Sequence, residues 1–266
     1  MSLVIQQLQE LQKRISERND PNWRVDECEK LFFFESSGLI DVQFYGNNWE
    51  ESFADFLQLL GRPEIAANLR SLSILGPDQG ANGTKNWDFT SLLESQVVFP
   101  NLTSFYIEPT EPHHHNHSII ATNASFYDEE GMIAQLVSRM PVLESLTLPS
   151  APDETFFAAG SKTLARLRVE SGYDHMNFIQ NLSRSEPFPE LRFLDFGDYS
   201  QKYTENYQEH CTPFDHYAAL FRSRAFAKVG YFRLRNPALS QNEILELKKL
   251  REGLQFHVVH EFGNYV

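Results

Sequence analysis

One short pattern of apolar residues recurs along this chain and limits its possible folds more than any other feature. The second apolar residue follows the first by three positions and the third follows the second by two, as in Leu191, Leu194 and Phe196. Several copies are also preceded by an apolar residue and a proline, as at Phe188 and Pro189. Shared spacing and a shared lead-in indicate a repeated structural unit. Its copies cover residues 69–74, 102–107, 143–148, 164–169, 191–196 and 229–234, with a weaker copy at 39–44.

Each copy predicts a short strand that must be covered on one face. Its last two apolar residues lie two positions apart, so their side chains point to the same side of a strand. A single strand cannot bury that side alone, and helical patterns lie between the copies. These patterns cover residues 50–60, 88–94, 128–139, 153–159, 174–182, 214–224 and 241–252. Strands and helices in alternation predict a solenoid with a parallel sheet inside and helices outside.

This succession of strands and helices resembles the leucine-rich repeat superfamily. The helix in each unit makes it most similar to the arc-shaped, ribonuclease-inhibitor-like branch. The resemblance implies an α/β fold, namely a right-handed leucine-rich repeat solenoid with a parallel inner sheet and outer helices. Successive copies begin 21 to 41 residues apart. We therefore expect an irregular arc with insertions in loops at one edge.

A longer string carries a second resemblance. Residues 163–172 read T-L-A-R-L-R-V-E-S-G, and a similar R-L-x-V-E-S-G run occurs in a little-characterised group of bacterial cytoplasmic leucine-rich repeat proteins. This resemblance implies a bacterial, cytoplasmic setting and no reaction. The two cysteines, Cys28 and Cys211, match no metal or redox spacing, which also favours a reducing compartment. The sequence has no signal-peptide or membrane-spanning pattern, so we expect no membrane association.

The two ends of the chain are predicted to cap the repeats. Residues 1–38 contain apolar residues at helical spacing in 4–15 and then favour a hairpin strand, which together predict an N-terminal cap. Residues 39–266 are predicted to form the irregular repeats and a C-terminal cap, with a capping box at 240–243. Within this second part, the composition of 76–86 predicts a loop.

The net charge of −13 is unevenly distributed along the chain. Residues 1–160 hold 9 Lys and Arg against 23 Asp and Glu, whereas residues 161–266 hold 14 against 13. An acidic chain disfavours general binding to nucleic acid or to an anionic membrane. Its first part instead favours a basic partner protein, because complementary charge speeds and orients association.

No arrangement of residues in the sequence predicts catalysis. Neither G-x-S-x-G nor H-E-x-x-H occurs, and the histidines outside one segment are scattered. Four imidazoles within five residues can hold a divalent metal, but adjacent histidines rarely converge on one ion without a framework. We therefore expect a solvated insertion loop, no metal and no cofactor, with a metal-dependent enzyme as the alternative. The histidines of this segment are His113, His114, His115 and His117.

The exposed positions of the predicted strands change in character at the copy that begins at Leu164. Earlier copies carry mainly small hydroxyl-bearing residues there, whereas the later copies carry arginine and aromatic residues. Arginine and aromatic side chains together are typical of interface hot spots. The candidate partner-binding residues are Arg166, Arg168, Phe193, Asp195, Tyr231, Arg233 and Arg235.

Parallel strands in register arrange these residues in rows, for which two interpretations are open. Arg166, Phe193 and Tyr231 are predicted to form one row. Arg168, Asp195 and Arg233 are predicted to form the next. In the first interpretation the rows are a patch that binds a partner. In the second, the aspartate pairs with both arginines of its row and the arginine of the other row stacks on the phenylalanine, which makes a structural ladder.

The sequence favours a binding function over an enzymatic one. We expect a monomeric, non-catalytic protein-interaction module that binds a partner protein on the concave sheet face, such as an inhibitor or immunity-type protein. Two alternatives are a metal-dependent enzyme that uses residues 113–117 and a protein that recognises an anionic ligand. The second alternative would use Arg166, Arg168, Arg233 and Arg235.

Overall fold

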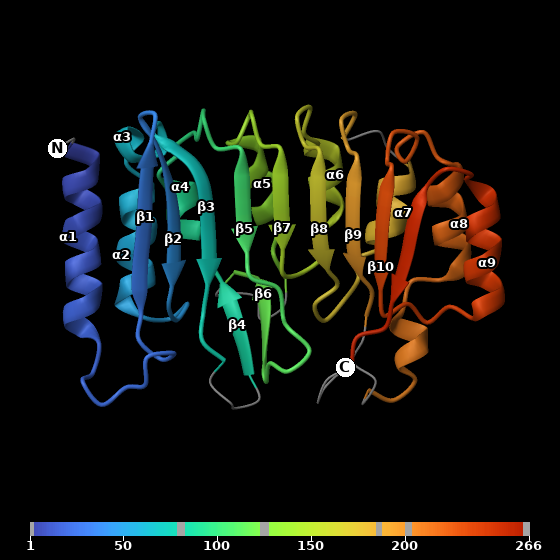
Figure 1. Cartoon of the computed structure of the whole chain (residues 1–266), viewed down its shortest axis with the longest axis horizontal. Coiled ribbons are helices and arrows are strands. Elements are labelled where there is room, and N and C mark those ends of the chain that lie inside the picture. Colours follow the sequence, from blue (N-terminus) through green and yellow to red (C-terminus); the bar gives the residue numbers. More distant parts are fainter. Residues whose placement is uncertain (1–2, 79–82, 123–127, 185–187, 200–203, 263–266) are drawn as a thin grey trace.

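The computed structural model describes residues 3–78, 83–122, 128–184, 188–199 and 204–262, which fold into a mixed α/β structure (Figure 1). The main sheet has the strand order β1-β2-β3-β5-β7-β8-β9-β10-β11. Strand β1 is antiparallel to β2, and all later neighbours are parallel. The strands are β1 (Lys30–Ser36), β2 (Leu39–Tyr45), β3 (Leu69–Leu75), β5 (Ser104–Ile107), β7 (Ser145–Leu148), β8 (Arg166–Glu170), β9 (Phe193–Gly197), β10 (Tyr231–Arg235) and β11 (Gln255–Val259).

The helices that follow the strands lie together on one face of this sheet (Figure 1). Helix α1 (Leu3–Arg18) instead packs against β1 and α2 at the N-terminal end of the sheet. Among the described residues, no helix is both long and apolar enough to cross a membrane. The other helices are α2 (Glu51–Leu60), α3 (Pro63–Ala66), α4 (Thr90–Glu94), α5 (Met132–Ser138), α6 (Glu154–Ala159), α7 (Phe178–Arg184), α8 (Phe214–Arg222) and α9 (Gln241–Leu250), with a 3-10 helix at Tyr207–His210.

The repeated apolar residues form the core between the sheet and the helices. Their side chains face the helices because they occupy alternate positions along each strand. The second apolar residues of successive copies are aligned by the strand register, and all are buried. They are Leu72, Phe105, Leu146, Leu167, Leu194 and Phe232. Each predicted copy therefore overlaps a strand, and each predicted helical pattern overlaps a helix.

A second, two-stranded parallel sheet was not predicted. It pairs β4 (Gly83–Trp87) with β6 (Asn116–Ile120), and Figure 1 shows it near the edge where β3 and β5 end. The prediction of a loop at 76–86 is therefore wrong for its second half, while residues 79–82 lie outside the described part. The buried indole of Trp87 donates a 2.9 Å hydrogen bond from Nε1 to Ser118 Oγ, which joins the two strands.

Candidate functional site

The face of the main sheet that points away from the helices, called the open face below, contains the predicted rows. In the strand register, Phe193 lies between Arg166 and Tyr231. Two residues further along each strand, Asp195 lies between Arg168 and Arg233. The predicted arrangement of the two rows is thus confirmed, because period two along each strand and a parallel register determine it together.

Five charged residues on strands β8, β9 and β10 form a hydrogen-bonded group, called the charged network below. Asp195 accepts hydrogen bonds at 2.7 Å from Nε of Arg233 and from Nε of Arg235. Glu170 accepts from Nη1 of Arg235 and, at 3.3 Å, from Nη2 of Arg168. Asp195 and Arg235 are each only 1% exposed. The network is therefore built around a buried ion pair.

The surroundings of the charged network keep its central arginine charged. Burial lowers the pKa of Arg235, but the negative charges of Glu170 and Asp195 outweigh this effect and raise it overall. Burial raises the pKa of Glu170, although Arg235 and Arg168 oppose that rise. Gly197 leaves room for the Glu170 carboxylate, because a Cβ at this position would lie 2.0 Å from Glu170 Oε2.

These contacts change the role of two predicted partner-binding residues. Asp195 and Arg235 are buried beneath their neighbours, so neither presents a free charge to a partner. The charges therefore form a ladder, as in the second interpretation, but one pairing differs. Among the hydrogen bonds of the described residues, Arg168 donates to Glu170, and none joins it to Asp195. Glu170 was missed as a member of the site. The register that aligns Glu170, Gly197 and Arg235 across three strands is the signal that could have identified it.

Next to the charged network, three stacked rings form what is called the aromatic row below. The ring centroids of Phe193 and Tyr231 are 4.8 Å apart with planes at 7°. Tyr231 and His257 follow at 5.0 Å and 26°. Phe193 and Tyr231 are half-buried, whereas His257 and Arg166 are exposed. His257 lies on the last strand, outside the predicted repeats, so the repeat pattern does not point to it. The predicted stack of Arg166 on Phe193 is not among the ring contacts of the described residues.

The opposite end of the open face carries a different aromatic pair. Phe32 and Phe34 on β1 are 50% and 65% exposed, and with neighbouring polar residues they line a cavity of about 250 Å³. In that cavity Asp41 accepts hydrogen bonds from Arg70 and Ser71. The hydrogen bond from Arg70 lowers the pKa of Asp41 despite its partial burial. The sequence pattern of residues 1–38 predicts a cap and does not indicate this exposed pair.

The histidine segment is more ordered than the predicted insertion loop. Nδ1 of His115 lies 2.9 Å from Asp78 Oδ2, and the His117 ring packs 5.0 Å from that of Tyr173. His117 belongs to β6, so the prediction of a solvated loop is wrong for this residue. Burial lowers the pKa of both His114 and His117. Across the described residues, no three histidine, cysteine or carboxylate side chains are grouped as a metal site requires.

One further buried carboxyl lies outside the open face. Glu129 accepts hydrogen bonds from the backbone N–H groups of Ile133, at 2.6 Å, and Asp153, at 3.0 Å. Burial nevertheless raises its pKa to about 7. The carboxyl lines a cavity of about 270 Å³ together with Ser150 and Tyr173. Its two backbone bonds link the start of α5 to the segment before α6, which gives Glu129 a structural role.

No protein-family model, no curated protein and no solved structure matches the chain.

Proposed function

We propose that this chain is an irregular leucine-rich repeat solenoid that acts as a non-catalytic protein-interaction module. Its partner is a protein that binds the open face of the sheet at the aromatic row. The resemblance carried by residues 163–172 supports a bacterial cytoplasmic setting, in which an inhibitor or immunity-type protein is a fitting role. The acidic first part of the chain supports a partner with an overall basic surface.

The observation that carries this proposal is the support of accessible rings by a buried ionic group. Phe193 on β9 and Tyr231 on β10 stack nearly parallel, and the charged network lies beside them on β8, β9 and β10. Side chains that are already fixed lose little entropy when a partner binds. Aromatic rings with adjacent arginine are the side chains most often found at the centre of protein interfaces.

The remaining accessible arginines fit the rim of such an interface. Arg166 is exposed, and Arg168 and Arg233 retain 25% and 35% exposure of their side chains. Arg168 and Arg233 already bond to carboxylates, so each can contribute to a partner contact without leaving a buried charge unpaired. Rim charges of this kind affect the association rate more than the affinity.

The two alternative functions have less support. A metal-dependent enzyme would need at least three converging ligands. His113 and His114 pack against each other, whereas His115 bonds to Asp78 and His117 packs against Tyr173. Recognition of an anionic ligand would need free arginines, yet Arg168, Arg233 and Arg235 are each paired with a carboxylate. Of the four arginines considered for that role, only Arg166 has no carboxylate partner among the described residues.

The test is capture of a partner from cells that naturally make this chain, using matched variants. The double variant Phe193→Ala with Tyr231→Ala removes two rings of the aromatic row. The control variant Phe32→Ala with Phe34→Ala removes two rings from the other end of the same face. We expect the first variant to lose a bound protein, with affinity lowered by about 2 kcal/mol or more, and the control to keep it.

Thermal unfolding of the same variants separates binding from folding. A capture pattern shared by the parent and both variants would contradict the proposal, as would the absence of any captured protein. A lowered unfolding midpoint with undiminished capture would assign the aromatic row to the scaffold.

A further inference from the structure

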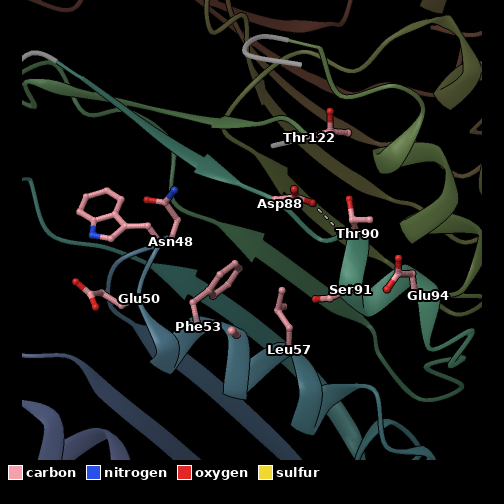
Figure 2. Close-up of a pocket in the computed structure, with 11 residues that line it drawn as sticks. Asn48, Glu50, Phe53, Leu57, Asp88, Thr90, Ser91, Glu94 and Thr122 are labelled. Carbon is pink, nitrogen blue, oxygen red and sulfur yellow. Dashed lines mark hydrogen bonds between the residues drawn. The ribbon is translucent and has the colours of Figure 1, made fainter. Parts of the chain in front are cut away.

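A groove on the helix side of the molecule is separate from the open face. It has a volume of about 640 Å³ and lies between α2 and α4, where β2, β4 and β6 end (Figure 2). A hydrogen bond of 2.9 Å from Asn48 Nδ2 to the carbonyl oxygen of Asn86 joins two of the segments around it. The name α2–α4 groove is used below for the cavity whose lining includes Trp49, Glu50, Phe53, Leu57, Asp88 and Glu94.

The floor of the α2–α4 groove is apolar and its edge carries an exposed indole. Phe53 and Leu57 point from α2 into the groove, and both belong to the buried core (Figure 2). Trp49 is 54% exposed, although burying a tryptophan side chain against a partner contributes a large apolar area to binding. Exposed aromatic residues beside an apolar depression are typical anchors of protein interfaces.

The charge of the α2–α4 groove is negative throughout. Among the described residues, the lining contains Glu50, Asp88 and Glu94 and no lysine or arginine. Among the ion pairs of the described residues, Glu50 and Glu94 take part in none. The N-terminal end of α2 adds about half a positive elementary charge, which offsets only a small part of three carboxylates. The groove is therefore complementary to a cation with apolar parts.

The carboxylates are distributed along the groove and do not converge on one point. Figure 2 shows Glu50 at one end and Glu94 at the other, with Phe53 and Leu57 between them. Separated carboxylates do not suit a single metal ion, whose oxygen ligands surround one centre. They suit an extended segment in which an apolar side chain lies between two basic ones, and the basic side chain near Glu50 can also rest on the indole of Trp49.

We propose that the α2–α4 groove binds an extended basic segment of a protein, with an apolar side chain on Phe53 and Leu57 and basic side chains near Glu50 and Glu94. This inference rests on the proposed function in taking the ligand to be a protein. It adds a second contact site on the opposite side of the sheet, and it gives a binding role to three of the acidic residues in the first part of the chain. A partner that reaches both sites gains affinity from their linkage.

The experiment titrates the whole chain with two capped peptides, Arg-Leu-Arg and Arg-Ala-Leu-Ala-Arg, by calorimetry and by tryptophan fluorescence. The same peptides with glutamine in place of arginine are the ligand controls. We expect the double variant Glu50→Gln with Glu94→Gln to weaken binding of the better arginine peptide by about fivefold or more. Glu50 makes no side-chain capping bond to α2, so this change leaves the helix start intact.

Matched protein controls distinguish the groove from general electrostatics. Glu246→Gln with Glu252→Gln removes two exposed charges at α9 and should change affinity by less than about twofold. Trp49→Ala should weaken binding, whereas Trp23→Ala, which removes an indole that is 39% exposed elsewhere, should not. The variant Phe193→Ala with Tyr231→Ala should bind the peptides like the parent, so failure here and failure of the proposed open-face site give different results.

Three outcomes would overturn this inference. They are no binding of either arginine peptide, equal weakening by the groove and α9 variants, and binding of arginine amide alone as tightly as the better peptide. The last result would identify a site for a small organic cation.

Discussion

Strands β3, β5 and β7 differ from strands β8, β9 and β10 on the open face but not on the face toward the helices. Toward the helices, both groups bury one apolar residue after another in register. On the open face, the first group carries Ser71, Ser104 and Ser145 where the second carries Arg166, Phe193 and Tyr231. Strand pairing therefore does not require charges or rings on the open face, which is where function can vary.

The charged network is an unusual way to fill that face. Moving ions out of water carries a large desolvation penalty, and well-packed apolar residues often stabilise a site as well or better. The serine-bearing strands pair without such a network. The main effect of the charged groups on β8–β10 is therefore to hold side chains in place. Their hydrogen bonds fix Arg168 and Arg233 beside the aromatic row.

The largest effect is expected from Arg235→Ala in the second group of strands. This change leaves Asp195 and Glu170 in a buried place without their main cation, which should cost about 3 to 5 kcal/mol of unfolding free energy. Urea denaturation monitored by circular dichroism measures it. The matched change in the first group, Arg70→Ala, removes a more exposed partner of Asp41 and should have a much smaller effect. Equal losses in both variants would show that the two groups do not differ in this respect.

A slightly smaller effect is expected on the face toward the helices, where the two groups are alike. Leu146→Ala in β7 and Leu194→Ala in β9 each remove a buried side chain from the core. Each should lower the unfolding free energy by about 2 to 5 kcal/mol, through lost transfer energy and a residual cavity. The two losses should be similar in denaturant titrations. An unchanged stability for Leu146→Ala would reject the assignment of that residue to the core.

Measuring stability against pH can separate two buried carboxyls, Glu170, which is paired with cations, and Glu129, which among the described residues is not. Glu170 bonds to two arginines, whereas Glu129 has no ion pair among the described residues. The pKa of Glu129 is about 7 in the folded chain, above its ordinary 4.5. Its neutral form is therefore favoured by folding, and the associated stability is complete below pH 4.5 and lost as the pH rises past about 7.

Replacing Glu129 by glutamine should remove this pH dependence. Relative to the parent, Glu129→Gln should gain up to about 3 kcal/mol between about pH 5 and about pH 8. Denaturant titrations at a series of pH values measure the difference between the two curves, which cancels the contributions of other groups. A parent and variant whose curves run parallel would show that Glu129 does not titrate in this range.

Most of the fold was predictable because it depends on periodicity, and parts of the site were not because they depend on distant contacts. Period two along each strand, with the repeats in parallel register, predicts that Arg168, Asp195 and Arg233 share a row. The same pattern does not show which charged side chains are buried. The burial of Arg235, for example, depends on its ion pair with Glu170, two strands away. The β4–β6 sheet was missed for a similar reason, because its short strands pair across a separation of 33 residues, as between Gly83 and Asn116.

The smallest effect is expected from Ser104→Ala and Ser145→Ala on the open face of β5 and β7. Both side chains are half-buried, and neither hydroxyl contributes to the side-chain hydrogen bonds of the described residues, in contrast to Ser71, which bonds to Asp41. Removing either hydroxyl should therefore change the unfolding free energy by less than about 0.5 kcal/mol, whereas Ser71→Ala should lose about 1 kcal/mol. Thermal and denaturant unfolding of the three variants tests this order. A loss of 1 kcal/mol or more for Ser104→Ala or Ser145→Ala would mean that this part of the open face also holds a specific polar network. The two groups of strands would then differ in the kind of network they carry, because both would have one.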